Sequence, residues 1–288
     1  MKLISEDKLS LDDRVGDYFP EFNTTEKNEI TIRHLLQHES GLPAFRVYVD
    51  ELKTRAEIVD AIKNEPLINP VGTNYVYSDL GMILLAEIVG TIANQPIDAY
   101  VRNELFHPMG MNSTYFNPKN VNNRYINRIP PTEFDTVYRK QLIQAEVHDE
   151  RAWYMDGVAG HAGLFASADD LAKFGTMILN NGTYLGKEYI KEDVIAEFTS
   201  LQSEKSGRGL GFDRKSPSGF TTAGQLASND TFGHLGFTGT SMWIDREKNM
   251  IVILLTNRTF PNRVYGKRIS RIRAAVADAA FSSLLNKP

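Results

Sequence analysis

The strongest hydrophobic pattern in the chain is the apolar run over residues 80–93, which would make a helix apolar on nearly every side. A helix of that kind is normally buried in a protein core. Ser78 stands where an N-cap is expected, and Asp79 in the first turn suits the positive end of the helix dipole. Tyr77 therefore stands at the mouth of a deeply anchored helix. That position suits a reaction centre, although a tyrosine packing beside an ordinary cap gives the same pattern.

Shorter amphipathic patterns predict further helices. Thr31 is an expected N-cap, and the helix that it opens is expected to stop at Ser40-Gly41. The other expected helices cover residues 54–62, 96–105, 168–179 and 271–285. Residues 112–155 are polar and weakly periodic, which predicts a long surface excursion.

From residue 209 the hydrophobic period changes to that of strands. The expected strands are residues 231–237, 240–245 and 249–256. Helices first and an antiparallel sheet last predict an α+β fold. We expect a single domain over residues 1–288, with a mostly helical lobe over about 20–205 and the sheet strands with the last helix over 206–288.

Composition narrows the function classes without choosing one. Hydrophobic residues make up 42% of the chain and charged residues 24%, which is ordinary for a soluble globular protein. The net charge of −4 gives no basic footprint for nucleic acid or an anionic membrane. The absence of cysteine excludes disulfides and thiol chemistry but does not decide the compartment. The apolar runs are too short to span a bilayer.

Two histidines four residues apart could chelate a metal. His34 and His38 have this spacing on one expected helix. However, the residues between them include no glutamate and no third ligand is obvious. We therefore expect these histidines to cap, pack or bond to backbone, and we expect no metal and no cofactor.

Ser5-Glu6-Asp7-Lys8 matches the Ser-x-x-Lys nucleophile pattern. The chemistry needs the lysine one helical turn from the serine, in a dry site where the pKa of the lysine can fall. The two acidic residues between them are typical of a solvated surface. We interpret the match as coincidence.

Two glycine-rich stretches carry histidines. Residues 157–163 surround His161 with glycines, which indicates backbone passing close to a ligand or to another element; His161 could line a cleft mouth or pack within its loop. Residues 233–239 place His234 on an expected strand, where glycines would let a substrate approach backbone amides, as in an oxyanion hole. A structural histidine beside a hairpin is the alternative for His234.

Together these stretches resemble the serine β-lactamase, penicillin-binding protein and esterase family. Tyr77-Ser78-Asp79 resembles its second motif, Tyr-x-Asn or Ser-x-Asn, and His234-Leu235-Gly236 resembles its third, Lys-Thr-Gly or His-x-Gly. Further similar segments are residues 30–43, 108–111, 159–174 and 237–257. Class C and esterase-like members, with tyrosine in the second motif, are the nearer match. The resemblance implies a β-lactamase-like fold, with an antiparallel sheet flanked by helices.

One departure from the family concerns its nucleophile. The family's Ser-x-x-Lys precedes a stretch similar to Lys8–Asp13, so alignment places the serine and lysine before Met1. The two N-terminal strands of the sheet would be missing as well. The resemblance therefore implies an N-terminally truncated, incomplete domain that is inactive as written. Its open sheet edge would pair with a second copy, the missing N-terminal segment or another chain.

For a complete protein, the resemblance implies acyl-enzyme formation. A serine would attack the carbonyl of an ester, amide or peptide while its lysine and Tyr77 pass the proton. The amide of Phe237, next to Gly236, would contribute to the oxyanion hole. Asp79 in place of asparagine accepts but does not donate hydrogen bonds, and a neutral His234 in place of lysine attracts anions weakly. Both changes move the expected substrate from penicillins towards esters or D-amino-acid amides and peptides.

Two functions remain open on the sequence alone. The first is a serine hydrolase of esterase or peptidase type. The second is a non-catalytic module of the same fold, appended to another enzyme or completed by another chain. The resemblance also implies a periplasmic or secreted protein, and we expect a small-molecule substrate, no nucleic acid and no membrane span.

Overall fold

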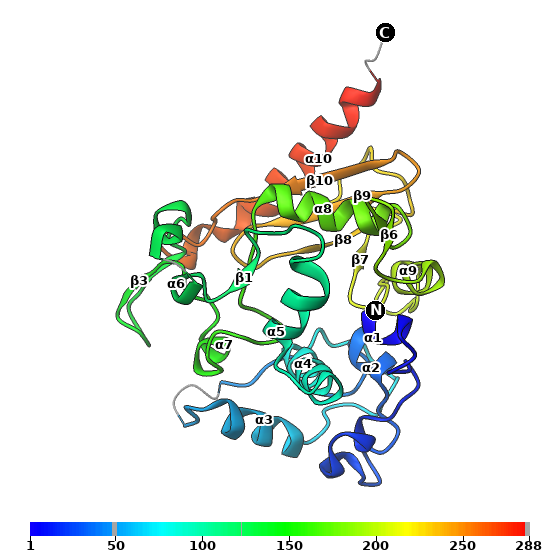
Figure 1. Cartoon of the computed structure of the whole chain (residues 1–288), viewed down its shortest axis with the longest axis vertical. Helices are drawn as coiled ribbons and strands as arrows, with labels where there is room; N and C mark the ends of the chain where they lie inside the picture. The colour runs from blue at the N-terminus through cyan, green and yellow to red at the C-terminus, as the bar shows by residue number, and fades with distance from the viewer. Residues whose placement is uncertain (48–50, 122, 286–288) are drawn as a thin grey trace. The chain divides into compact units, whose positions relative to one another are not determined.

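The structure is a computed structural model that describes residues 1–47, 51–121 and 123–285 (Figure 1). The chain divides into two compact units. The first contains Met1–Ile126 and Ala145–Phe165, and the second contains Asn127–Gln144 and Ala166–Pro288. Helices α8 (Ala168–Leu179) and α9 (Glu192–Thr199) belong to the second unit with the sheet, whereas the sequence pattern groups them with the helical lobe.

The first unit is mostly helical. Its elements are α1 (Lys2–Ser5), η1 (Val15–Asp17), η2 (Pro20–Phe22), α2 (Ile32–Gln37), α3 (Arg55–Asn64), α4 (Asp79–Ala93), α5 (Ile97–Val101), the π-helical η3 (Arg102–Phe106), β1 (Tyr115–Phe116), α6 (Pro118–Val121), α7 (Glu150–Tyr154) and β4 (Leu164–Phe165). Strands β1 and β4 form an antiparallel pair. The short helix η4 (Asn123–Arg128) runs from the first unit into the second.

Helix α4 is the centre of the first unit. Helices α2, α3 and α5 pack around it (Figure 1). Between residues 79 and 93 only Thr91 is exposed, and Leu80, Ile83 and Leu84 are fully buried. Each fully buried side chain of this size contributes about 1.5–3 kcal/mol of hydrophobic stabilisation. The prediction of a buried helix opened by Ser78 is confirmed.

The glycine-rich stretch 157–163 passes directly against helix α4. A Cβ atom added at Gly160 would lie 2.0 Å from the carbonyl oxygen of Met82. Glycine at position 160 therefore lets two backbones approach more closely than any side chain allows. The sequence left open whether this stretch passes close to a ligand or to another element. The structure shows it passing close to another element, helix α4.

The second unit contains the sheet. Its elements are β2 (Glu133–Asp135), β3 (Gln141–Ile143), α8, β5 (Thr183–Tyr184), β6 (Lys187–Glu188), α9, β7 (Asp213–Arg214), β8 (Phe232–Leu235), β9 (Ser241–Asp245), β10 (Met250–Leu254), η5 (Arg263–Arg268) and α10 (Ile269–Leu285). The main sheet is antiparallel with strand order β10-β9-β8-β7. The three predicted strands and the closing helix are confirmed.

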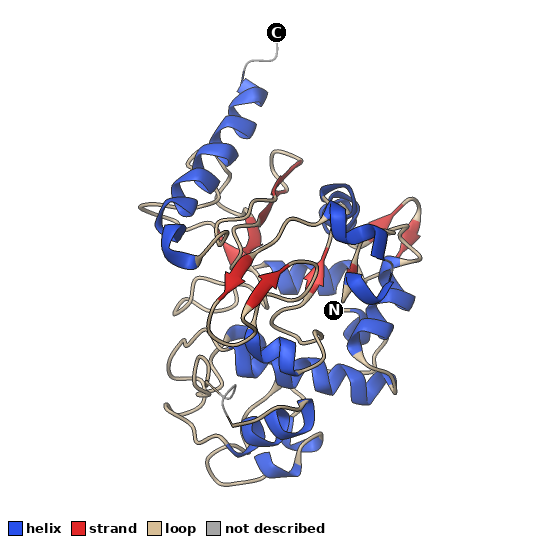
Figure 2. Cartoon of the chain, turned by 90° about the vertical axis from the view of Figure 1, so that its left-hand side faces the viewer, coloured by secondary structure: helices blue, strands red, loops and turns tan. Residues whose placement is uncertain are grey.

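Helices α10 and α8 cover opposite faces of this sheet, whose strands are red in Figure 2. Trp243 and Val252 lie opposite each other in register and pack in one core with Phe281 of α10. The side chain of Ile251 alternates to the other face and lies 3.0 Å from the position that a Cβ atom of Gly175 on α8 would take. Both faces are therefore buried, which explains why β8, β9 and β10 are rich in apolar residues.

Residues 112–155 are not a surface excursion throughout, so that prediction is wrong in part. They form β1, α6, η4, the β2–β3 hairpin and α7, and they are divided between the two units. Ile143, Ala152 and Met155 are fully buried. These elements are two to six residues long, so each buries too few side chains to produce a visible period.

Candidate active site

The Tyr77 corner, which we define as residues 77–79 and their hydrogen-bond partners, presents a phenol on a fixed backbone. Val76, just before it, donates its N–H to the carbonyl of His38 at 2.9 Å. The Tyr77 side chain is 43% exposed, whereas Ser78 is 1% exposed. The backbone is thus held inside the unit while the phenol is accessible from outside.

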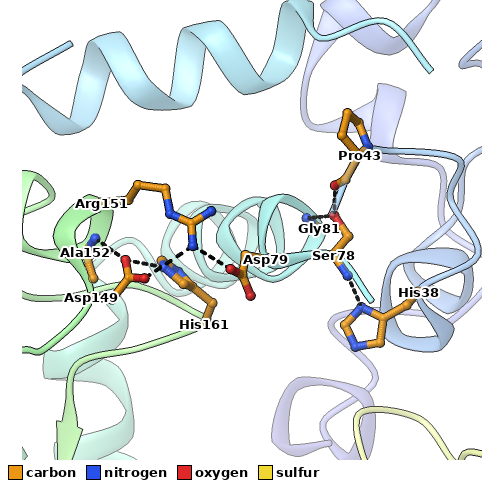
Figure 3. Close-up of polar contacts among 9 residues, drawn as sticks. All are labelled: His38, Pro43, Ser78, Asp79, Gly81, Asp149, Arg151, Ala152 and His161. Atoms are coloured by element: carbon orange, nitrogen blue, oxygen red, sulfur yellow. Dashed lines mark hydrogen bonds and ion pairs between the residues drawn. The ribbon is translucent and has the colours of Figure 1, made fainter. Parts of the chain in front are cut away.

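Ser78 is fully engaged as a helix cap (Figure 3). Its N–H donates to Nδ1 of His38 at 3.1 Å, and its hydroxyl donates to the carbonyl of Pro43 at 2.6 Å. The same Oγ accepts the N–H of Gly81 at 3.3 Å. With its proton donated and its oxygen buried, this hydroxyl serves the helix and does not serve as a nucleophile.

Asp79 forms an ion pair that the sequence did not indicate. Its Oδ2 accepts from Nη2 of Arg151 at 2.5 Å, and the same nitrogen lies 3.2 Å from Oδ2 of Asp149 (Figure 3). The Arg151 side chain is 11% exposed. Burial acts to lower the pKa of Arg151, but the charges of Asp149 and Asp79 and their hydrogen bonds raise it overall. One oxygen of the predicted substrate-binding carboxylate is therefore occupied by a cation of the protein itself.

Asp149 links this ion pair to His161. It caps helix α7 by accepting the N–H of Ala152 at 2.9 Å, and its Oδ1 lies 2.9 Å from Nε2 of His161. Burial acts to raise the pKa of Asp149, but the hydrogen bond and charge of His161 and the charge of Arg151 hold it well below its usual range. The His161 side chain is 3% exposed, so it packs within the unit, as the second of our two alternatives predicts.

The two histidines with metal-like spacing have other partners. Nδ1 of His34 lies 3.0 Å from the hydroxyl of Thr31, the N-cap of α2, and burial lowers the pKa of His34. His38 ends α2 in the left-handed conformation, with φ 58°, so the helix stops two residues before the predicted Ser40. Within residues 1–47, 51–121 and 123–285, no group of three or more His, Cys, Asp or Glu side chains is arranged to hold a metal ion.

The Ser-x-x-Lys pattern near the N-terminus lacks the geometry of a nucleophile and its base. Ser5 is the last residue of α1 and is buried, whereas Lys8 is exposed and pairs with Glu6 at 2.9 Å. The hydrogen bond that Lys8 donates to Glu6 raises the pKa of Lys8. A lysine that must accept a proton needs the opposite shift, which favours the interpretation as coincidence.

In the second unit, His234 lies on strand β8. Its Nδ1 is 2.9 Å from the carbonyl of Leu235, and burial, followed by the charge of Arg208, lowers the pKa of His234. A carbonyl only accepts, so the neutral ring carries its proton on Nδ1 and leaves Nε2 as an acceptor. The observed environment agrees with the neutral imidazole expected from the sequence.

The Phe237 turn, which we define as residues 236–240, is held from behind by helix α10. Gly236 donates its N–H to the carbonyl of Thr240 at 2.8 Å. Nη2 of Arg273 then donates to both carbonyls of this pair, at 2.7 Å to Gly236 and 2.8 Å to Thr240. A Cβ at Gly236 would lie 2.0 Å from the Thr240 hydroxyl oxygen, so any side chain there would force that hydroxyl to move.

Two arginines flank the exposed ring of Phe237, which is 58% exposed. The Arg258 guanidinium lies 4.4 Å from the ring centroid, and its Nε donates to the Phe237 carbonyl. The Arg263 guanidinium lies 5.8 Å from the same centroid and also pairs with Glu133 at 2.9 Å. Burial and the charge of Arg263 lower the pKa of Arg258, which remains a cation at neutral pH.

The structure brings the predicted site residues together in two groups. Tyr77 and Asp79 lie in the first unit. His234, Gly236 and Phe237 lie in the second unit. That the two groups serve one catalytic gap stays a prediction.

Sequence reasoning missed four charged residues that surround these groups, namely Arg151, Asp149, Arg258 and Arg273. Asp149 could have been recognised as an N-cap, because an acidic residue and a short helix follow it. The arginines gave no signal in the sequence. Apart from the contact of Arg151 with Asp149, their partners lie 21 to 72 positions away along the chain, beyond the reach of helix or strand periodicity.

Comparison with known proteins identifies the family. The Beta-lactamase family model matches residues 1–277, so the chain belongs to the Beta-lactamase family. A relative from Escherichia coli (strain K12) named "Putative D-alanyl-D-alanine carboxypeptidase" is 34% identical over 282 residues, which cover 89% of this chain. A protein of the same name from Salmonella typhimurium is 33% identical. The chain spans 65% of the length of these relatives.

Solved structures agree on the fold. A penicillin-binding protein homologue from Caulobacter crescentus has a TM-score of 0.74 at 20% identity, covering 98% of this chain and 79% of its own. Simvastatin synthase from Aspergillus terreus has a TM-score of 0.73 at 14% identity, covering 99% and 81%. The predicted α+β, β-lactamase-like fold is therefore confirmed. At these identities the likeness does not extend to the activity.

Proposed function

We propose that residues 1–288 carry the proton-transfer and oxyanion-binding parts of a serine hydrolase that forms an acyl-enzyme with a D-amino-acid peptide or amide. The single observation that carries this proposal is the accessible phenol of Tyr77 on a backbone fixed by the buried cap Ser78. A fixed, accessible phenol can pass a proton if a neighbouring cation lowers its pKa. The carboxypeptidase name of the relatives favours a D-alanyl peptide over a simple ester.

The Phe237 turn supports the oxyanion role. Arg273 holds the carbonyls of Gly236 and Thr240, so the backbone between them is fixed before any substrate binds. Donors that need no reorganisation stabilise developing negative charge most effectively. The amide of Phe237 would act here together with the amide of the nucleophilic serine.

The charges near Phe237 suggest where the anionic end of a peptide binds. His234 is neutral at pH 7, because burial and the charge of Arg208 lower its pKa. Arg258 lies against the Phe237 ring and keeps its charge. A guanidinium binds a carboxylate through two parallel hydrogen bonds. We therefore assign carboxylate binding to Arg258. The neutral His234 gives its Nδ1 proton to the Leu235 carbonyl, so its Nε2 can only accept a hydrogen bond from a substrate N–H.

The nucleophile of this reaction does not come from residues 1–288. Lys8 has a raised pKa and lies in solvent, and the hydroxyl of Ser78 is committed to Pro43. No other Ser-x-x-Lys occurs in the chain. We therefore expect these residues alone to show no acyl transfer, and we expect a longer protein with an in-frame Ser-x-x-Lys to show it.

The test compares the chain with such a longer protein. Substrates are a D-alanyl-D-alanine peptide, p-nitrophenyl acetate and nitrocefin. The longer protein should hydrolyse the peptide, and Tyr77→Phe in it should lower kcat by about 10²–10⁴-fold. Tyr138→Phe, in the second unit and outside the site, is the matched control and should change little. Turnover of none of the three substrates by the longer protein would overturn the proposal.

A non-catalytic module is the second candidate, favoured by the lack of a usable Ser-x-x-Lys in this chain. Genomic DNA upstream of Met1 discriminates the two. An in-frame Ser-x-x-Lys supports the hydrolase, whereas a start codon with its ribosome-binding site at Met1 supports the module.

We also propose that the outer edge of β10 pairs with an additional strand. Within the described residues, β10 is hydrogen-bonded only to β9, and both of its faces are covered by helices. An unpaired edge strand is a template for another strand. Sedimentation should show self-association that grows with the concentration of residues 1–288 and disappears in the longer protein. A monomer at all concentrations would contradict this pairing.

A periplasmic or secreted location remains part of the proposal. No single described helix is long and apolar enough to cross a membrane, and α4 with residues 97–106 passes that test only as a pair bent by 69°. The relatives with the carboxypeptidase name come from Escherichia coli and Salmonella. Cell fractionation with a tagged longer protein tests the location directly, and recovery in the cytoplasm alone would contradict it.

A further inference from the structure

We infer that His38 is a positioning residue for Tyr77, acting through an unprotonated Nδ1 and through its ring face. This inference deepens the proposed function, because it concerns how the proton-transfer phenol is held. It stands on three contacts of one buried side chain. Nδ1 accepts the N–H of Ser78, and the imidazole packs against the rings of Tyr77 and Tyr75 (Figure 3 for the first contact).

Hydrogen bonds that do not involve the ring hold the backbone of His38. His38 is the C-cap of α2, and its N–H bonds to the carbonyls of His34 and Leu35. Its own carbonyl accepts the N–H of Val76, one residue before Tyr77. The left-handed conformation at His38, with φ 58°, turns the chain out of the helix at this point. The residue is 3% exposed, so its side chain has little room to move.

The contact with Ser78 determines which ring nitrogen carries the proton. The Ser78 N–H is a donor, so Nδ1 at 3.1 Å must present a lone pair. The neutral ring therefore has its proton on Nε2. A proton on Nδ1 would set two donors against each other and would leave a buried N–H without its acceptor. The tautomer of His38 therefore indicates whether the hydrogen bond from the Ser78 N–H, next to Tyr77, is formed.

The ring contact acts on the phenol itself. The centroids of His38 and Tyr77 are 4.5 Å apart with an interplanar angle of 36°. Tyr75 meets the imidazole edge-on, at 6.2 Å and 79°. His38 therefore has Tyr75 on one side and Tyr77 on another, and it restricts the rotamers of a tyrosine that is otherwise 43% exposed. An exposed tyrosine without such a partner would sample several rotamers, and few of them would suit proton transfer.

Two variants separate the two contacts. His38→Asn keeps an oxygen acceptor near the position of Nδ1 and tolerates a positive φ, but it removes the ring. His38→Phe keeps a ring of similar width but removes the acceptor. His107→Asn, on an exposed histidine of the same unit, is the control for replacing a histidine elsewhere.

The first readout is nuclear magnetic resonance of residues 1–288, labelled with ¹⁵N-histidine and ¹³C-tyrosine. At pH 7 the unsubstituted chain should show His38 with its proton on Nε2 and a hydrogen-bonded Nδ1. Exchange of the Ser78 amide with solvent should be about tenfold faster in His38→Phe and close to unchanged in His38→Asn. The Tyr77 ring signals should shift most in His38→Asn and least in His107→Asn.

A proton on Nδ1 of His38 in the unsubstituted chain would overturn the inference whatever the variants do. Unchanged Ser78 exchange in a folded His38→Phe would also overturn it. These measurements need no enzyme activity, so they decide the positioning role even if the proposed hydrolase fails its own test. In an active longer protein, both His38 variants should lower kcat about 10- to 100-fold with little change in KM. A fall in activity that only follows the folded fraction would indicate a structural role alone.

Discussion

The Tyr77 corner and the Phe237 turn fix their backbones through opposite kinds of group. At the Tyr77 corner, side-chain acceptors hold backbone N–H groups, since His38 takes the amide of Ser78 and the Ser78 hydroxyl takes that of Gly81. At the Phe237 turn, the guanidinium of Arg273 holds two backbone carbonyls. Holding carbonyls fixes a turn without using its amides, which suits an oxyanion hole. At the Tyr77 corner the backbone amides of Ser78 and Gly81 are already hydrogen-bonded, and the accessible group is the side-chain phenol of Tyr77.

The two regions also differ in charge. Asp79 and Asp149 share the cation Arg151 at the Tyr77 corner. Arg258 and Arg263 flank the ring at the Phe237 turn, where Glu133 pairs with Arg263. An anionic group is therefore attracted to the Phe237 turn and not to the Tyr77 corner. The comparison therefore supports the proposed assignment of carboxylate binding to Arg258 at the Phe237 turn.

The largest expected effect comes from removing the shared cation of the Tyr77 corner. Arg151→Met removes the cation that pairs with Asp79 and one of the partners of Asp149, which keeps His161 and the Ala152 N–H. It should lower the free energy of unfolding by about 3–5 kcal/mol. The measurement is urea unfolding followed by the fluorescence of Trp153, which lies in the same unit, in a Trp243→Phe background. Adding Asp79→Asn should recover part of the loss, because one buried charge disappears. A loss under about 1 kcal/mol would show that the pair behaves as an exposed one.

The next effect concerns the arginine behind the Phe237 turn. Arg273→Met removes two charge-assisted hydrogen bonds to carbonyls and should cost about 2–4 kcal/mol of unfolding free energy. Trp243 fluorescence in a Trp153→Phe background reports this second unit. Arg273→Lys is the matched control and should restore up to half of the loss. If Trp153 responded as strongly as Trp243, the comparison of two separately fixed regions would fail.

A smaller effect depends on pH. The pKa of Asp149 is depressed in the folded chain, and an unfolded aspartate has a pKa of about 3.9. Its stabilisation is therefore fully present above pH 5 and is lost as the pH falls below 4 towards the folded pKa. Asp149→Asn should cost on the order of 2 kcal/mol at pH 7, and this difference should shrink on acidification. Unfolding measured from pH 3 to 8 checks it, and a constant difference would contradict it.

The smallest effect tests the coincidental motif. Lys8→Ala removes an exposed lysine paired with Glu6 and should leave the free energy of unfolding close to unchanged. In the longer protein it should leave kcat unchanged. Loss of activity in Lys8→Ala would reassign the base to this unit and would break the division of roles drawn above.

The sequence predicts the long elements well and the short ones poorly. Helix α4 and strands β8, β9 and β10 carry dense apolar patterns, and the structure has each of them close to the expected residues. The hairpin β2–β3 and helix α7 are three to five residues long per element, and they were missed within the supposed surface excursion. Elements of this length repeat their pattern at most once, so periodicity has nothing to detect.

The candidate site divides in the same way. The role of Ser78 as a cap and the close backbone approach at Gly236 were predictable, because capping and tight turns depend on residues a few positions apart. The ion pair of Asp79 with Arg151 and the contact of Arg258 with Phe237 were not. Each of these joins segments far apart in the chain, and the sequence does not say which segments meet.

The sequence by itself determined a buried helix opened by Ser78, an antiparallel sheet that ends the fold, and the family to which both belong. Only the tertiary structure decided that His38 accepts the amide beside Tyr77, that Asp79 is paired, and that Arg273 holds the Phe237 turn. The physical reason is the distance along the chain over which each kind of interaction acts. Periodicity and capping act over a few residues, whereas these contacts form only after packing has brought distant segments together and excluded water from between them.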